Sequence, residues 1–547
     1  GKARPYLILA APMLIVAIIL MFMTPNKGSN AIQMIWIAVS YNRVKTLALC
    51  AEMLYNKTCI LSQGNTVQGL CDVPQHPQAL CGAVLTFWLL HMRKEDPHME
   101  KNMESRAYAR LAALFDDGAF TEINAAVKEA EDAAGVVCAY GYVKGNAVYA
   151  FSQDKTVNNG AVGLQHAAKI TKLYGLAAKT GTPIVGIHDS NGAFVNGTVD
   201  SLTAYGRMLE AASQLSGVVP QIAVVAGTCA GSAALLACGS DFVVMTKDAE
   251  LFVAPPFAEH AGTAQSAAKA GICALVCEDD IAAMEQARAL VNLMPINNLA
   301  GAPMFEYAES ESQASPSLPE LVKAVADADS LLELYGDYGK AAYTALATLG
   351  GTTVGIAATN KTEDPLNTED CAKLARFMRT CDAFSVPVIT FVDTMGFAAS
   401  SEAEQTGSIQ AMTRLAACYA EATTIKLSVV TGNAVGAAFT ALAGAACGAD
   451  FTYAWDQAVI SPMAPLTAVE FLWHDKLKGA ADANAKRKEL AAEYAATLAS
   501  AQSAAEKGGV DAVIAPADTR VTLLSALDIL SGKRVSKLPK KHNNIPF

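Results

Sequence analysis

The pattern of apolar and polar positions changes once along the chain, near residue 100. Residues 6–23 carry no charge. An α-helix needs about 20 apolar residues to cross a bilayer, and this segment approaches that length. Two later apolar stretches, 31–39 and 79–90, are too short to span a bilayer alone. The pattern therefore predicts a hydrophobic extension over residues 1–98 with at most one transmembrane helix, in its first part.

Beyond this extension, helix-like and strand-like patterns alternate. Residues 108–133 carry apolar positions at helical spacing among charged ones, which predicts surface helices. Strand-like runs flank Gly145-Asn146, which predicts a β-hairpin with these two residues in its turn. Helical spacing returns over 166–181, before a compact apolar run at 183–187. This alternation predicts an α/β architecture.

An internal repeat divides the rest of the chain into two similar parts. Residues 183–194 and 387–398 each hold a Pro, an apolar strand, an Asp, two further residues and a Gly. A second shared motif begins near Ile222 and Leu427, at nearly the same offset of about 204 residues. The matched pairs are Asp189 with Asp393, Gly192 with Gly396, Gly227 with Gly432, and Gly231 with Gly436. Two domains of one fold are therefore expected.

The second motif of each copy has the features of an anion site. It consists of a β-branched strand, a Gly, three residues, another Gly and an Ala-rich helix. The first N–H groups of a helix have no partner within the helix, so they can hold a developing oxyanion. The predicted donors are the amides of Gly231-Ser232 and Ala437-Ala438. Tight packing of helix on strand also requires small residues, but two copies with matching Asp-x-x-Gly turns favour a site.

The composition and the absence of several sequence motifs argue against some classes of function. A net charge of −11 argues against nucleic-acid binding. The 13 cysteines show no metal-ligand spacing, so we expect reduced thiols in a cytoplasmic protein and no metal site. The chain lacks a nucleotide-binding P-loop, a G-x-S-x-G elbow and an H-E-x-x-H motif. His188, inside an apolar strand, is interpreted as a hydrogen-bonded packing residue rather than a base.

Residues from about 103 to 547 resemble the carboxyltransferase subunit of biotin-dependent acyl-CoA carboxylases and decarboxylases. The resemblance rests on four segments: 151–170, 216–234, 375–397 and 537–547. It implies tandem crotonase-like domains, with acyl-CoA bound by residues 99–325 and N1′-carboxybiotin received by residues 326–547. It also implies an active site between the N-terminal half of one subunit and the C-terminal half of another, and therefore a dimer or hexamer.

The resemblance assigns roles to individual residues. Gly231-Ser232 would hold the thioester enolate, and Ala437-Ala438 the ureido oxygen of biotin. Thr440 would face the acyl pocket, although a packed helix residue is an alternative. The family usually has Gly at position 191 and Arg at 194, so Phe194 puts part of the CoA contact in question. The other implied binding residues are Asn191, Gly192, Ala193, Gly227, Ala230, Gly396, Phe397, Val435 and Gly436.

The family mechanism needs partner chains. In it carboxybiotin releases CO2, the freed biotin nitrogen removes the acyl α-proton, and the enolate attacks CO2. The chain has neither an Ala-Met-Lys-Met biotin-attachment motif nor an ATP-binding loop. The implied partners are a biotin carboxyl carrier protein and either biotin carboxylase or a membrane decarboxylase subunit, in the cytoplasm or at a membrane. The resemblance does not decide which acyl-CoA is the substrate or in which direction the carboxyl group moves. The alternative function is a subunit of a sodium-pumping methylmalonyl- or glutaconyl-CoA decarboxylase, which runs the reverse transfer.

Two other functions are considered. A free-standing crotonase-type hydratase or isomerase would need a placed carboxylate pair. Glu402 and Glu404 are the acids near Gly396, and we interpret them as a solvated turn. A catalytically silent membrane scaffold would account for the apolar N-terminal segment.

The N-terminal segment has a resemblance of its own. Residues 1–42 resemble an internal piece of the glycoside-pentoside-hexuronide:cation symporters. A transporter needs many packed spans, and nothing after Asn42 supplies them. We interpret the segment as a fusion to a protein that starts at Met99 or Met103, or alternatively as a membrane anchor.

Overall fold

The computed structural model describes residues 105–544, apart from 130–131, 255–260, 313, 360–363, 479 and 543. These residues belong to one compact unit that begins at Pro97. The hydrophobic extension and the predicted transmembrane segment lie outside the described residues. Within the described ranges, every helix is too short or too polar to cross a membrane.

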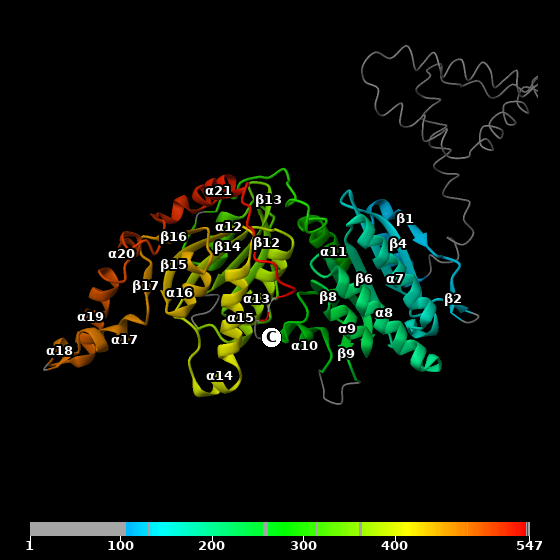
Figure 1. Cartoon of the computed structure of the whole chain (residues 1–547), viewed down its shortest axis with the longest axis horizontal. Coiled ribbons are helices and arrows are strands. Elements are labelled where there is room, and N and C mark those ends of the chain that lie inside the picture. Colours follow the sequence, from blue (N-terminus) through cyan, green and yellow to red (C-terminus); the bar gives the residue numbers. More distant parts are fainter. Residues whose placement is uncertain are drawn as a thin grey trace, which may run out of the picture. The chain divides into compact units, whose positions relative to one another are not determined.

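The first half of the unit is built on one sheet with the strand order β1-β4-β5-β6-β7-β8-β10, and β9 pairs with β7 (Figure 1). The strands are β1 (Phe120–Ile123), β4 (Val136–Val143), β5 (Asn146–Gln153), β6 (Ile184–Ser190), β7 (Gln221–Ala230), β8 (Phe242–Thr246), β9 (Glu250–Phe252) and β10 (Leu275–Cys277). Its helices are α6 (Arg106–Leu114), α7 (Leu164–Thr180), α8 (Val199–Leu215), α9 (Ser232–Cys238), α10 (Ala264–Lys269) and α11 (Asp280–Leu293). The strands from β5 to β8 run parallel, as crossover helices between them require.

The second half repeats this sheet in the order β11-β12-β13-β14-β15-β16-β18, and β17 pairs with β15. The strands are β11 (Leu332–Leu334), β12 (Ala342–Leu349), β13 (Thr352–Thr359), β14 (Val388–Thr394), β15 (Lys426–Val435), β16 (Phe451–Trp455), β17 (Val459–Ser461) and β18 (Ala512–Ile514). The helices are α12 (Leu318–Val325), α13 (Thr368–Ala383), α14 (Ser401–Gln405), α15 (Ser408–Glu421), α16 (Ala437–Leu442), α17 (Pro465–Leu472), α18 (His474–Leu477), α19 (Ala483–Ala496), α20 (Ala501–Glu506) and α21 (Thr519–Leu530). The predicted α/β class and the duplicated fold are confirmed.

Two local predictions are wrong in part. The helical pattern of residues 108–133 holds only for α6. Phe115 adopts extended backbone (φ −86°, ψ 150°), which ends the helix, and after a short turn β1 pairs with β4. The predicted hairpin is present as β4 and β5, but its turn is Lys144-Gly145, because Val143 pairs with Asn146. Both turn residues have positive φ, as a two-residue type I′ turn requires.

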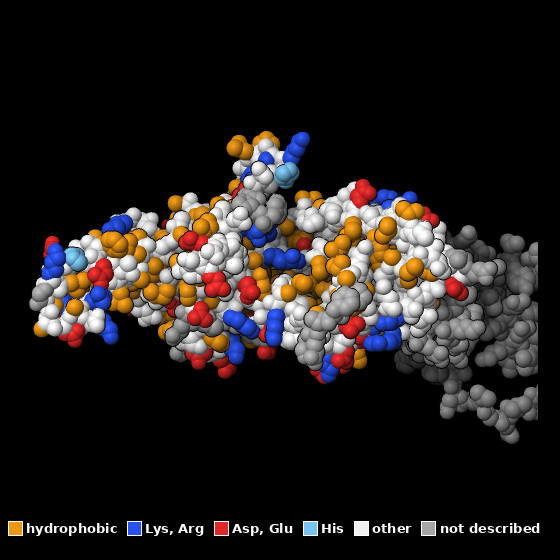
Figure 2. Space-filling view, turned by 90° about the horizontal axis from the view of Figure 1, so that it is seen from below, with side chains coloured by type: hydrophobic (Ala, Val, Ile, Leu, Met, Phe, Trp, Pro, Cys, Tyr) orange, Lys and Arg blue, Asp and Glu red, His pale blue; other side chains and the backbone are white. Residues whose placement is uncertain are grey.

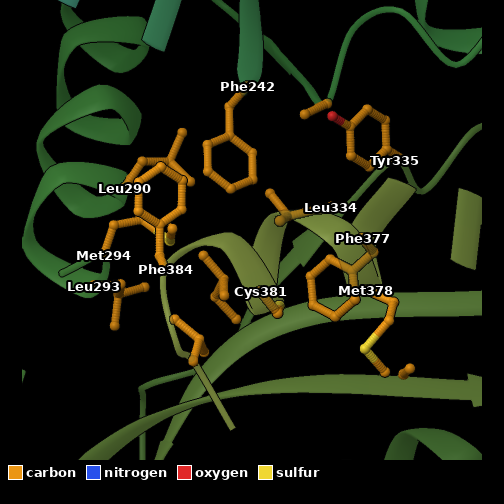
Figure 3. Close-up of a cluster of buried hydrophobic side chains, with 14 of the residues drawn as sticks. Phe242, Leu290, Leu293, Met294, Leu334, Tyr335, Phe377, Met378, Cys381 and Phe384 are labelled. Carbon is orange, nitrogen blue, oxygen red and sulfur yellow. The ribbon is translucent and has the colours of Figure 1, made fainter. Parts of the chain in front are cut away.

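An apolar core joins the two halves. Phe242 from β8 and Leu290 from α11 lie in the same buried cluster as Phe377 from α13 and Phe384, which follows that helix (Figure 3). Each of these side chains is almost inaccessible to solvent. Burying a large apolar side chain contributes about 1.5–3 kcal/mol. The cluster therefore stabilises the two halves as one folded body.

Candidate functional site

Each half contains the same turn between a central strand and a short helix. β7 is followed by Gly231 and α9, and β15 by Gly436 and α16. Gly231 has φ 64° and ψ −131°, and Gly436 has φ 64° and ψ −142°. L-residues with a side chain rarely adopt this conformation, so glycine is needed at both positions.

The amides around these glycines differ in whether they already have partners. Gly231 donates its N–H to Phe252 O (2.9 Å), and Gly436 donates to Ser461 O (2.8 Å). These bonds join each turn to β9 or β17. The next two amides of each copy make no hydrogen bond to another described residue; they belong to Ser232, Ala233, Ala437 and Ala438.

One predicted donor is therefore corrected. The N–H of Gly231 is not free for a ligand, because Phe252 O already accepts it. The residues that match Ala437 and Ala438 are Ser232 and Ala233, since Gly231 and Gly436 hold the same place in the turn. The free pair in the first half thus lies one residue later than the pair Gly231-Ser232 predicted from the sequence.

One residue of each free pair reaches the surface of the single chain. Ala437 is exposed and Ser232 is half-buried, whereas Ala233 and Ala438 are buried. Two large cavities of the described part, of about 650 and 610 Å³, are lined by other residues. Neither of these two cavities includes a residue of the free pairs.

The Asp-x-x-Gly turns place a second loop against each strand end. Ser190 Oγ accepts the N–H of Gly192 (3.1 Å), and Thr394 Oγ1 accepts that of Gly396 (3.2 Å). Both glycines have positive φ, of 104° and 109°. A Cβ on Gly192 would lie 3.1 Å from Ala230 O, and one on Gly396 would lie 3.2 Å from Val435 O. The structure thus brings together the two motifs of each repeat.

The repeated aspartates explain the first glycine of the second motif. Asp189 Oδ1 accepts the N–H of Thr228 (3.3 Å), and Asp393 Oδ1 accepts that of Asn433 (2.8 Å). A Cβ on Gly227 would lie within the space of the Asp189 carboxylate, at 2.2 Å from Oδ1. Gly432 stands in the same relation to Asp393, at 2.4 Å from its Cγ. Each carboxylate therefore holds the strand that leads to the helix with the free amides.

Arg110 is a residue that the sequence reasoning missed. Its side chain is 2% exposed and pairs with Asp189 Oδ2 at 3.0 Å. It also donates to Ala226 O (2.5 Å) and to Asp280 Oδ2 (2.9 Å). Lys155 Nζ lies 3.5 Å from Asp189 Oδ1. The only local signal was an arginine on the apolar side of α6, whereas its partner Asp189 lies 79 residues away.

The buried histidines are neutral packing residues. His188 is 2% exposed and packs edge-on against Phe151, with ring centroids 5.3 Å apart. Burial lowers the pKa of His188 to about 4. Burial, together with Lys169, lowers the pKa of His166 to about 3. The interpretation of His188 as a packing residue agrees with this, but its Nδ1 has no hydrogen-bond partner among the described residues.

The remaining predicted residues lie at the rims of the two turns. Asn191 and Thr440 are exposed, and Ala193, Phe194 and Phe397 are half-buried. Glu402 and Glu404 are exposed, as expected, but they lie on the short helix α14 rather than in a turn. The described residues contain no cluster of side chains suited to a metal ion.

Comparison with known proteins identifies the family of the chain. The carboxyl transferase domain family matches residues 101–545, and the MFS/sugar transport protein family matches residues 1–61. Methylmalonyl-CoA decarboxylase subunit alpha of Propionigenium modestum is 35% identical over 495 residues, covering 83% of this chain and 95% of the relative. The propionyl-CoA carboxylase carboxyltransferase subunit of Haloferax mediterranei is 33% identical over 480 residues, covering 81% and 93%.

A solved structure gives the same answer. The crystal structure of transcarboxylase 12S, a hexamer with hydrolysed methylmalonyl-coenzyme A bound, has a TM-score of 0.77 and 30% identity. The match covers 87% of this chain and all of that one. Together with the duplicated sheets and their paired glycine turns, these matches show that the chain belongs to the carboxyl transferase domain family.

Proposed function

We propose that the chain moves a carboxyl group between biotin, carried on a partner protein, and the α-carbon of a short acyl-CoA. The observation that carries this proposal is the duplicated pair of amides without partners, one pair in each half. One pair suits a thioester oxygen and the other suits a urea oxygen. Relatives of this chain are named for transfer on propionyl- and methylmalonyl-CoA.

The first half holds the acyl-CoA in this proposal. The N–H groups of Ser232 and Ala233 donate to the thioester oxygen as it gains negative charge. Preorganised donors of this kind stabilise an enolate without any reorganisation at the moment of reaction. Asn191, Gly192 and Ala193 border the acyl group, and Ala230 lets the backbone come close to it, whereas Gly227 leaves room for the Asp189 carboxylate.

The second half receives biotin. The start of α16 fits the ureido oxygen, because that oxygen accepts hydrogen bonds and the amides of Ala437 and Ala438 have no other described partner. When bound, biotin supplies the carboxyl group and the nitrogen that exchanges a proton with the α-carbon. Gly396, Phe397, Val435 and Gly436 form the wall of this site, and Thr440 faces the acyl chain from α16.

In this mechanism the protein positions the two substrates and stabilises the negative charge that develops on them. The buried histidines are neutral, His188 in strand β6 and His166 in helix α7, and Glu402 and Glu404 are exposed on α14. A base supplied by the bound biotin makes a side-chain base unnecessary. The open face of each turn also suits a dimer or hexamer, in which the other subunit completes each site.

The direction of transfer defines a second candidate. A membrane decarboxylase would run the transfer from methylmalonyl-CoA to biotin, and the match to a methylmalonyl-CoA decarboxylase alpha subunit favours this version. In either direction the biotin carrier, and the biotin carboxylase or membrane decarboxylase subunit, are separate chains.

A carboxyl-exchange assay tests the proposal. The full chain is incubated with methylmalonyl- or glutaconyl-CoA and free biotin, or with acetyl- or propionyl-CoA and carboxybiotin prepared beforehand with a biotin carboxylase, ATP and bicarbonate, and separately with crotonyl-CoA in the absence of biotin. Products are separated by chromatography. We expect transfer with methylmalonyl-CoA that depends on biotin. Hydration of crotonyl-CoA without biotin, and no exchange, would instead support the hydratase. Binding of neither acyl-CoA nor biotin would support the scaffold.

A further inference from the structure

The short helices that follow the two glycine turns expose different side chains at matched positions. Gly231 and Gly436 hold the same place in their turns. Leu235 on α9 and Thr440 on α16, each four residues further along the chain, are therefore equivalent in the repeat. Both side chains face outward, since Leu235 is 52% exposed and Thr440 is also exposed. One helix thus presents a large apolar side chain where the other presents a hydroxyl group.

Leu235 differs from the other aliphatic residues of its own helix. Those residues are buried in the core of the first half: Ala233, Ala234, Leu236 and Ala237. Leu235 lies three residues after Ser232, and residues three apart in a helix share one face. Its side chain therefore lies on the same face of α9 as Ser232, the half-buried member of the first free amide pair.

A second exposed apolar side chain borders the same turn. Val253 follows β9 directly and is 67% exposed. Its backbone oxygen lies 3.9 Å from the position that a Cβ on Gly231 would take, next to the bond between Phe252 O and the N–H of Gly231. Figure 2 shows hydrophobic side chains gathered over this part of the first half. The turn that holds the first amide pair therefore has apolar side chains exposed on α9 and after β9.

We propose that Leu235 is a biotin-binding residue, whose side chain packs against the apolar ring of the biotin held by the second half of another copy of the chain. This inference rests on the proposed function, in which Thr440 on the biotin half faces the acyl group held by the other half. α9 and α16 hold matched places in one repeat, so the relation is reciprocal. The residue equivalent to Thr440 then faces the ligand of the opposite half, which is biotin.

The chemistry of the two side chains matches the two ligands. The ureido oxygen of biotin bonds to the amides of Ala437 and Ala438 in the proposed function, and the carbon and sulfur atoms of the second ring remain to be covered. Contact with Leu235 removes those atoms and the exposed leucine carbons from water, which is favourable. The acyl group carries the carboxyl group that is transferred, and the hydroxyl of Thr440 is able to donate a hydrogen bond to it.

Exchange kinetics of the full chain with free biotin and methylmalonyl-CoA test this role. We expect Leu235→Ala to lower kcat/KM for biotin by about fivefold or more, because the apolar contact is lost, and to leave the KM for methylmalonyl-CoA unchanged. Leu235→Met keeps an apolar side chain of similar size and should retain most of the kcat/KM for biotin. Leu498→Ala is the matched control, since Leu498 is 51% exposed and lies outside both turns, and it should change neither value.

Several results would overturn this role. An unchanged kcat/KM for biotin in a folded Leu235→Ala chain would do so, and so would a rise only in the KM for methylmalonyl-CoA, which would place Leu235 beside the acyl group. A loss of both values with a change of oligomeric state in sedimentation would assign Leu235 to the subunit contact instead. If the unsubstituted chain exchanges and Leu235→Ala matches it, this role alone fails. If the unsubstituted chain shows no biotin-dependent exchange, the proposed function fails with it.

Discussion

Replacing Ala437 by proline tests the amide pair of the second half directly. Ala437 is the first residue of α16, and the first helical position is where proline is tolerated, since its fixed φ suits the helix. The substitution removes one N–H that bonds to no other described residue. Gly436, the preceding residue, has ψ −142°, outside the α region that a following proline disfavours.

The expected effects on stability and activity differ sharply. Because no described protein hydrogen bond is lost, the free energy of unfolding should change by no more than about 1 kcal/mol, roughly the value of one hydrogen bond. In other enzymes, removal of one oxyanion-hole donor lowers kcat by about 10²–10³, which corresponds to about 2.7–4 kcal/mol of transition-state stabilisation. We expect a loss of that size for biotin-dependent exchange with methylmalonyl-CoA.

The assay compares three variants with the unsubstituted chain. Urea unfolding gives stability, and exchange with free biotin gives kcat and KM. Ser232→Pro makes the same change in the first half, and Ser232→Ala is the control that keeps the amide and removes only the hydroxyl. A folded Ala437→Pro chain that retains more than a third of the exchange rate would refute the role of this amide.

Three further outcomes are expected. Gly227→Ala should destabilise the chain by about 3–5 kcal/mol, because the added Cβ displaces the Asp189 carboxylate from its buried pair with Arg110; urea unfolding checks this, and Gly175→Ala, with open space around its Cβ on a helix, should instead be neutral or stabilising. His188→Asn should keep at least a tenth of the exchange rate, and a folded but inactive variant would contradict a site without a side-chain base. The pKa of His188 is lowered to about 4 in the folded state, so the unfolded chain binds more protons below pH 6.5 and stability falls as the pH drops. Between pH 7 and 5 this loss is about 2 kcal/mol, and urea unfolding of His188→Asn should show a correspondingly smaller loss.

Much of the fold could be predicted from the sequence, because its signals are local or repeated. The alternation of helix and strand periods indicated the α/β class. Two motifs repeated at one offset indicated two copies of one fold. The glycines at 231 and 436 were recognised as special because a strand, a glycine and an Ala-rich helix follow one another without interruption. Such patterns reflect backbone conformation and side-chain periodicity, which neighbouring residues determine.

The tertiary structure decided which backbone amides and charged side chains have hydrogen-bond or ion-pair partners within the described chain. The sequence could not show that Phe252 O takes the N–H of Gly231, which moves the free pair to Ser232 and Ala233. Nor could it pair Arg110 with Asp189, or place Arg376 beside the backbone of Ser240. These contacts join residues far apart in the chain, so they depend on how the strands and helices pack. A single sequence specifies its local conformations directly, whereas hydrogen-bond partners and charge balance arise only when distant segments meet.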